Sequence, residues 1–185
     1  ANSNLALLKF FHDSGTGFDI VSRGELQRAL MAGAKGNDIV YSGVGKSRED
    51  IRAALRADIG CFNVESIPEL DRINEVALEE KRMAPVSVRV NPDVDAKTHP
   101  YISTGLKNNK FGVSYDQTVA LYQRAAKLPG IRISGIDMHI GSQITELEPF
   151  VHAADKIFDI VDALAQNGIM LDHLDFGGGL GVRYT

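Results

Sequence analysis

Short apolar runs alternate with amphipathic stretches along the chain. Each β-branched run is followed by a polar turn and then by apolar positions three and four residues apart, a pattern typical of a strand followed by a helix. The predicted strands are 18–21, 38–42, 61–64, 86–90, 133–140 and 171–176. The predicted helices are 5–12, 24–32, 48–57, 68–81, 116–126 and 147–166. This alternation predicts an α/β fold with a parallel sheet, either doubly wound or closed into a (β/α) barrel.

The predicted helix starts share one local signal. A serine or threonine is followed three positions later by an acid or amide, as in a capping box. The pairs are Ser22 with Glu25, Ser47 with Asp50, Ser66 with Glu69, Ser114 with Gln117, and Thr145 with Glu148. Their repetition predicts strand-to-helix connections that all run in one sense.

A glycine run, Gly177, Gly178 and Gly179, follows the last predicted strand. Backbone without side chains can approach a ligand closely and direct several N–H groups at a phosphate. In a (β/α) barrel, phosphate sites lie in the loops after the late strands. A tight turn that needs positive φ angles is the alternative explanation.

Two nucleotide-binding motifs fail on spacing. A dinucleotide fingerprint that starts at Gly177 would need glycine where Val182 stands, and a P-loop ending at Ser47 would need glycine at Val40. Lys46, in the P-loop-like stretch, is therefore interpreted either as a solvated loop lysine or as a residue that faces the site.

The stretch "IDMHIGSQ" is the second candidate for chemistry. Asp137 and His139 alternate on a predicted strand that runs into Gly141 and Ser142. In a barrel, this order brings an imidazole, a hydroxyl and backbone N–H groups to the mouth. A hydrogen-bonded core histidine is the alternative. The other histidines, at 12, 99, 152 and 173, show no ligand spacing with His139, so no metal is expected.

An acid and a cysteine lie inside predicted strands. Asp19 would be costly in the middle of a buried parallel strand unless it is paired, so we expect it to meet a lysine or a cationic ring nitrogen. Cys61 is the only cysteine, which excludes an internal disulfide, and we expect it to be buried.

Composition narrows the class of protein. The 185 residues are 44% hydrophobic and 24% charged, as in an ordinary single globular domain. A net charge of −4 offers no basic surface for nucleic acid or an anionic membrane, and no apolar run reaches membrane-spanning length. We expect a cytoplasmic protein without either partner.

Four stretches together carry a family resemblance. They are "GTGFDIVSRGEL", "RVNPDVDAKTHPYISTGLKNNKFG", "DMHIGSQI" and "LDFGGGLG". These stretches resemble those of the diaminopimelate decarboxylases. The ornithine and arginine decarboxylases share the histidine and glycine motifs, but the long connection 91–113 resembles only the diaminopimelate decarboxylases. The resemblance implies an incomplete (β/α)8 TIM barrel of about six repeats. Residues 1–185 would form a partial barrel domain that lacks the first and last strands and the family's carboxy-terminal β domain.

The resemblance also implies chemistry. The family is homodimeric and uses pyridoxal phosphate to convert meso-2,6-diaminopimelate into L-lysine and carbon dioxide. By similarity, Gly177, Gly178 and Gly179 with Ser142 would bind the cofactor phosphate. His139 would stack on the pyridine ring, and Asp19 would lie near the cofactor lysine.

Three alternative functions remain open, and residues 1–185 would lack one residue that the family's reaction needs. The alternatives are a non-catalytic pyridoxal-phosphate-binding relative, an ornithine or arginine type of decarboxylase, and a phosphate-binding barrel of other chemistry. The family's cofactor-binding lysine would immediately precede Ala1. Residues 1–185 alone are therefore predicted to be inactive.

Overall fold

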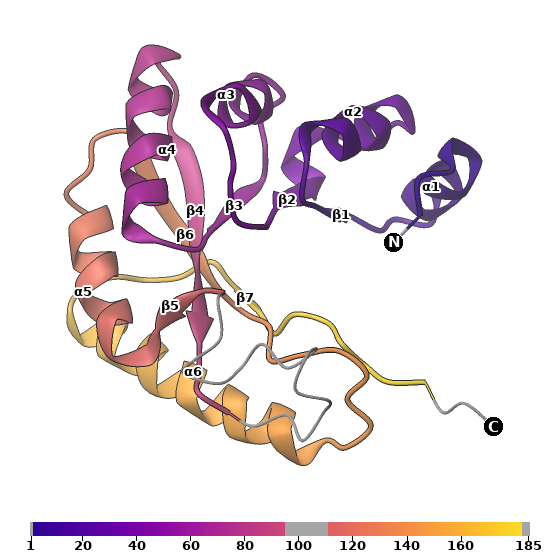
Figure 1. Ribbon diagram of the computed structural model, residues 1–185. Coiled ribbons are helices and arrows are strands. Elements are labelled where there is room, and N and C mark those ends of the chain that lie inside the picture. Colours follow the sequence, from indigo (N-terminus) through magenta and orange to yellow (C-terminus); the bar gives the residue numbers. More distant parts are fainter. Residues whose placement is uncertain (1, 95–110, 183–185) are drawn as a thin grey trace. The chain divides into compact units, whose positions relative to one another are not determined.

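The computed structural model describes residues 2–94 and 111–182 (Figure 1). The chain divides into two compact units, Ala1–Val86 with Leu128–Arg132 and Ser87–Lys127 with Ile133–Thr185. All twelve predicted strands and helices are confirmed, and their ends agree with the prediction within two residues. Within the described ranges, no helix is long and apolar enough to cross a membrane.

The first unit contains three short parallel strands in the order β1-β2-β3, followed by the start of β4. The strands are β1 (Phe18–Ile20), β2 (Ile39–Tyr41) and β3 (Cys61–Val64). The helices are α1 (Leu5–Asp13), α2 (Arg23–Met31), α3 (Arg48–Arg56) and α4 (Ile67–Glu79), with a short 3-10 helix η1 (Gly36–Asp38) before β2. In register, Asp19 lies opposite Val40, and Val40 lies opposite Cys61.

The core of the first unit forms around β3, in which all four residues are buried. The helix α4 supplies buried residues spaced three and four apart, including Leu70, Ile73 and Ala77, so one face of the helix packs inward. Cys61 is buried, as predicted.

Three of the five predicted serine or threonine caps are confirmed. Ser22, Ser47 and Ser66 each accept a hydrogen bond from the backbone N–H three residues later. Only Ser47 completes a capping box, because the Asp50 carboxylate accepts a hydrogen bond from the Ser47 N–H at 3.0 Å. Glu25 and Glu69 instead reach one residue further back, to the N–H groups of Val21 and Glu65.

The other two predicted pairs do not form the expected cap hydrogen bonds. Ser114 occupies the N-cap position of α5, but within the described residues its hydroxyl makes no cap hydrogen bond. The helix α6 begins at Glu148 with Leu147 as its cap, so Thr145 lies three residues before the helix. Pro149 in the first turn of α6 suits that position, because proline already has a helical φ angle and no N–H to satisfy.

The second unit contains the rest of β4 (Ala84–Asn91) and β6 (Ile131–Met138), together with β5 (Val113–Ser114) and β7 (His173–Asp175). The strands β5 and β7 pair in parallel with β4 and β6, and β4 neighbours β6. The helices are α5 (Tyr115–Ala125) and α6 (Glu148–Gln166). The two-residue strand β5 was not predicted, because it is too short to show a hydrophobic period.

A buried tyrosine on α5 forms hydrogen bonds to β4 and β6 in the second unit. The Tyr122 hydroxyl donates to the Gly135 carbonyl at 2.6 Å and accepts from the Val88 N–H at 3.2 Å. Gly135 is glycine for a packing reason, because a Cβ there would lie 2.3 Å from Nε2 of His173. The long predicted connection 91–113, including Gly105–Lys110, falls mostly outside the described residues.

Candidate functional site

Two loops run side by side beyond the carboxyl ends of β6 and β7. The strands pair in parallel up to Asp137 and Asp175, and the pairing resumes at a bridge between Ile144 and Leu180. The Ile144 N–H donates to the Gly179 carbonyl at 2.8 Å. Parallel pairing therefore brings residues 139–145 and the glycine run together, although 39 positions separate His139 from Gly178 in sequence.

Two of the three glycines are explained by the turn itself. Gly177 and Gly179 have φ angles of +70° and +94°. A Cβ at Gly177 would lie 2.3 Å from the Met138 carbonyl oxygen, and one at Gly179 would lie 1.9 Å from that of Gly141. The alternative drawn from the sequence, a tight turn with positive φ angles, is thus present at both ends of the run.

Gly178 differs from its neighbours. Its φ angle is not in the left-handed region, and a Cβ there would meet no described heavy atom within 4 Å. Neither backbone conformation nor packing requires glycine at this position. A ligand that approaches the backbone closely is a physical reason for a glycine in such a place.

The glycine amides lie next to His139. The Gly178 N–H donates to Nδ1 of His139 at 3.3 Å, and the Gly177 N–H donates to the Asp175 carboxylate at 2.7 Å. Nδ1 of His139 therefore acts as a hydrogen-bond acceptor in this arrangement. His139 is half-buried.

Ser142 belongs to the same loop pair. Its side chain is exposed, and its Cα would lie 3.4 Å from a Cβ at Gly179. The structure therefore brings together His139, Ser142 and the three glycines, which the sequence had selected from two separate motifs.

Asp19 lies in the first unit, and its environment corrects the sequence argument. We expected a buried acid, but Asp19 is exposed, so there is no large burial cost to offset. Its carboxylate accepts a 2.6 Å hydrogen bond from the Ser42 hydroxyl. A hollow of about 570 Å³ adjoins it, between α1, β1 and α2.

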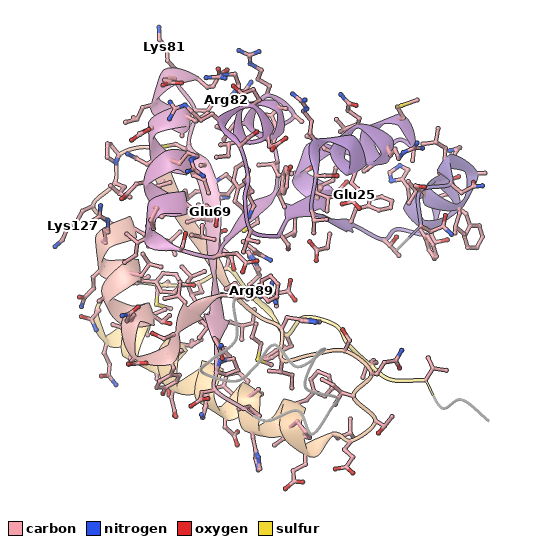
Figure 2. All side chains as sticks on the ribbon, in the orientation of Figure 1. Glu25, Glu69, Lys81, Arg82, Arg89 and Lys127 are labelled. Atoms are coloured by element: carbon pink, nitrogen blue, oxygen red, sulfur yellow. The ribbon has the colours of Figure 1, made fainter. Side chains whose placement is uncertain are left out.

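Lys46 is neither a solvated loop lysine nor exposed. Its side chain is 1% exposed and forms a 2.7 Å ion pair with Glu69, whose side chain is 6% exposed. Figure 2 labels Glu69 at the start of α4. The ammonium also donates to the carbonyls of Gly43 and Asn63, at 2.7 and 2.8 Å. All three of its protons are thereby used inside the protein.

Sequence reasoning missed Ser42 and Asn63, which join Asp19 to this buried pair. The Asn63 side-chain amide donates to the Ser42 hydroxyl at 3.1 Å, and both residues are buried. A usable signal was present in the sequence, because Asn63 interrupts the apolar strand "CFNV" with a polar side chain. Among the described residues, no cluster of three or more histidine, cysteine or acidic side chains could hold a metal ion.

Comparison with known proteins identifies the class. The family model for the pyridoxal-binding domain of pyridoxal-dependent decarboxylases matches residues 1–185. The chain belongs to this family, whose cofactor is pyridoxal phosphate.

Several relatives with high identity to the chain are diaminopimelate decarboxylases. The diaminopimelate decarboxylases of Pseudomonas aeruginosa and Neisseria meningitidis serogroup B are 58% and 57% identical to the chain over its whole length. The crystal structure of diaminopimelate decarboxylase from Helicobacter pylori, complexed with L-lysine, matches 98% of the chain with a TM-score of 0.96 and 47% identity. The resemblance expected from the four motifs is confirmed.

The same comparisons confirm the predicted fold class, an α/β segment of a TIM barrel. The chain spans 44% of the length of the two curated relatives and 46% of the H. pylori chain.

Proposed function

We propose that this chain is the pyridoxal-phosphate-binding part of a diaminopimelate decarboxylase, which releases carbon dioxide from meso-2,6-diaminopimelate to give L-lysine. Identity to diaminopimelate decarboxylases extends over all of the chain. The H. pylori and M. jannaschii relatives were each crystallised with L-lysine, the expected product. We further propose a cytoplasmic homodimer, and a single partial-barrel domain over residues 1–185.

The loop pair fits the phosphate of the cofactor. Gly178 is the observation that carries this assignment. Neither its φ angle nor its neighbours require glycine, so close approach of a ligand is the remaining reason for glycine at this position. The exposed Ser142 supplies a hydroxyl donor beside the glycine amides. A hydroxyl is a donor that a phosphate group accepts from, whereas the N–H groups of Gly177 and Gly178 already donate to Asp175 and to Nδ1 of His139.

The imidazole of His139 suits a stacking role. A flat ring can lie against the pyridine ring of the cofactor. The hydrogen bond from the Gly178 N–H to Nδ1 fixes the orientation of the ring. We propose that His139 orients the cofactor and that Asp19 acts beside the cofactor lysine.

Pyridoxal phosphate, when bound, stores the electron pair that the departing carboxylate leaves behind. The chain's own residues bind and orient the participants. Ser142 would hold the phosphate beside the open backbone at Gly178, His139 would hold the plane of the ring, and Asp19 would supply a negative charge near a lysine.

Substitution of Gly178 tests the phosphate site in the full-length enzyme. Gly178→Ala should leave the thermal unfolding midpoint nearly unchanged, because there is room for a methyl group. It should weaken pyridoxal phosphate binding about tenfold or more, since a side chain would keep the phosphate away from the backbone. An absorbance titration with cofactor and an assay of carbon dioxide release from meso-diaminopimelate measure the two effects.

Two matched glycine variants complete the test. Gly24→Ala in α2 also has a normal φ angle and room for a methyl group, and it should change neither binding nor stability appreciably. Gly179→Ala should destabilise the protein, because its Cβ would overlap the Gly141 carbonyl. Cofactor binding by Gly178→Ala equal to that of the parent enzyme would contradict the proposed phosphate site.

A further inference from the structure

A chain of side chains links the carboxyl ends of three neighbouring strands in the first unit. Asp19 lies on β1, Ser42 directly follows β2, and Asn63 lies on β3. The Asn63 amide donates to the Ser42 hydroxyl at 3.1 Å, and the Ser42 hydroxyl donates to the Asp19 carboxylate at 2.6 Å. The chain runs from a residue that is 1% exposed to a carboxylate that is exposed.

The direction of these hydrogen bonds follows from chemistry. An amide nitrogen can only donate, so the oxygen of Ser42 must accept from Asn63. The single hydroxyl proton of Ser42 is then directed to Asp19, whose carboxylate can only accept when it is ionised. A serine without the amide behind it could rotate its hydroxyl away from Asp19. Asn63 therefore selects the rotamer in which Ser42 holds the acid.

The inner end of the chain is anchored by the buried ion pair. Lys46 donates to the backbone carbonyl of Asn63 at 2.8 Å and to Glu69 at 2.7 Å. The second oxygen of Glu69 accepts from the Glu65 N–H at 2.8 Å. These hydrogen bonds connect the end of β3 to the start of α4, so they fix the backbone position from which the Asn63 side chain extends.

We infer that Ser42 is a positioning residue for the reaction: oriented by Asn63, its hydroxyl holds the carboxylate of Asp19 in one geometry at the carboxyl end of β1. The inference rests on the proposed function, because it takes Asp19 to act beside the cofactor lysine. Ser42 itself touches neither cofactor nor substrate in this account and acts only through Asp19.

A double-mutant cycle in the full-length, cofactor-loaded enzyme separates positioning from a general structural role. Ser42→Ala should lower kcat by about tenfold, since a hydrogen bond to a charged group is removed. The KM for meso-diaminopimelate should stay within about twofold. In an Asp19→Asn background, Ser42→Ala should cause almost no further loss, because the carboxylate that it positions is already gone.

Ser87→Ala is the matched control. Ser87 is a fully buried strand serine whose hydroxyl has no hydrogen-bond partner among the described residues, so its removal deletes the same group without breaking a bond. It should leave kcat unchanged. Ser42→Cys, which keeps a weaker donor of similar shape, should fall between the parent and Ser42→Ala. It replaces Ser42→Ala in the cycle if that variant does not fold.

The outcomes are distinguishable. Equal losses from Ser42→Ala in both backgrounds, or no loss in the parent enzyme, would overturn the inference and leave the proposed function intact. An Asp19→Asn variant as active as the parent would overturn the inference and the proposed role of Asp19, but not the proposed decarboxylase activity. A parent protein that shows no cofactor absorbance band and releases no carbon dioxide from meso-diaminopimelate would overturn the proposed function, and this inference with it.

Discussion

At the residue scale, the most consequential finding is the buried pair of Lys46 and Glu69. A buried charge is tolerated when its partner and its remaining hydrogen bonds are in place, and strongly destabilising when one partner is removed. Here the lysine has three acceptors, and the glutamate also caps the β3-α4 connection. The pair therefore holds the strand ends from which Ser42 and Asn63 project.

Removal of one partner should destabilise the protein more than removal of both. We expect Lys46→Met or Glu69→Gln alone to lower the free energy of unfolding by about 3–5 kcal/mol, because an unpaired polar or charged group is left in the interior. The double variant should recover part of that loss. Thermal unfolding midpoints of the three variants and the parent check this order. A double variant less stable than both single variants would contradict it.

At the scale of elements, the helix caps show which capping motifs in the sequence form cap hydrogen bonds in the structure. The same serine pattern precedes α3 and α5, yet only Ser47 forms a capping box. The acid at the third position of α3 can return a hydrogen bond to the serine N–H, as Asp50 does at 3.0 Å. The backbone angles at the two cap positions are alike, with φ −73° and ψ 165° at Ser47 and φ −63° and ψ 148° at Ser114, so neither the motif nor the entry of the chain decides by itself whether the cap bond forms.

Alanine substitution should separate these two serines. Ser47→Ala should lower the free energy of unfolding by about 1 kcal/mol, because the N–H of Asp50 loses its acceptor. Ser114→Ala should change it by less than about 0.5 kcal/mol, as is usual for a substitution that removes no specific interaction. Denaturant unfolding of both variants measures the difference. Equal losses would show that Ser114 caps α5 after all.

At the scale of the whole molecule, buried ionisable groups make stability depend on pH. Burial raises the pKa of Tyr41 to about 12, and the carboxylates of Asp50 and Glu25 add to the effect, while Arg23 opposes it. Tyr41 stacks on Phe62 with ring centroids 6.1 Å apart. The folded protein therefore favours the neutral phenol over the phenolate.

The sign of the pH effect follows from this raised pKa. Below the ordinary tyrosine pKa of about 10, the stabilisation from neutral Tyr41 is fully present. As the pH rises from 10 towards 12, the unfolded chain ionises first, and this contribution is lost. Tyr41→Phe should lose less stability over this window. Unfolding midpoints of both proteins between pH 9 and 11.5 measure the difference, and a constant gap would contradict the assignment.

Much of the fold was predictable from local patterns. Each strand carries an apolar run, and each helix has an amphipathic period of its own, so both can be read without knowledge of distant residues. The two-residue strand β5 could not be read in this way, because its pairing with β4 defines it. The predicted cap of α6 was wrong for a related reason, since Thr145 matches a cap motif that the chain does not use.

The sequence by itself determined the order of strands and helices, the family resemblance, and the choice of His139, Ser142 and the glycine run as candidates. Only the tertiary structure decided which side chains meet. Parallel pairing of β6 with β7 brings Gly178 to His139, and the ends of β1, β2 and β3 bring Asp19 to Ser42 and Asn63. The burial of Lys46 likewise depends on Glu69, a residue 23 positions away. Such contacts arise between residues far apart in the chain, and no local pattern records them.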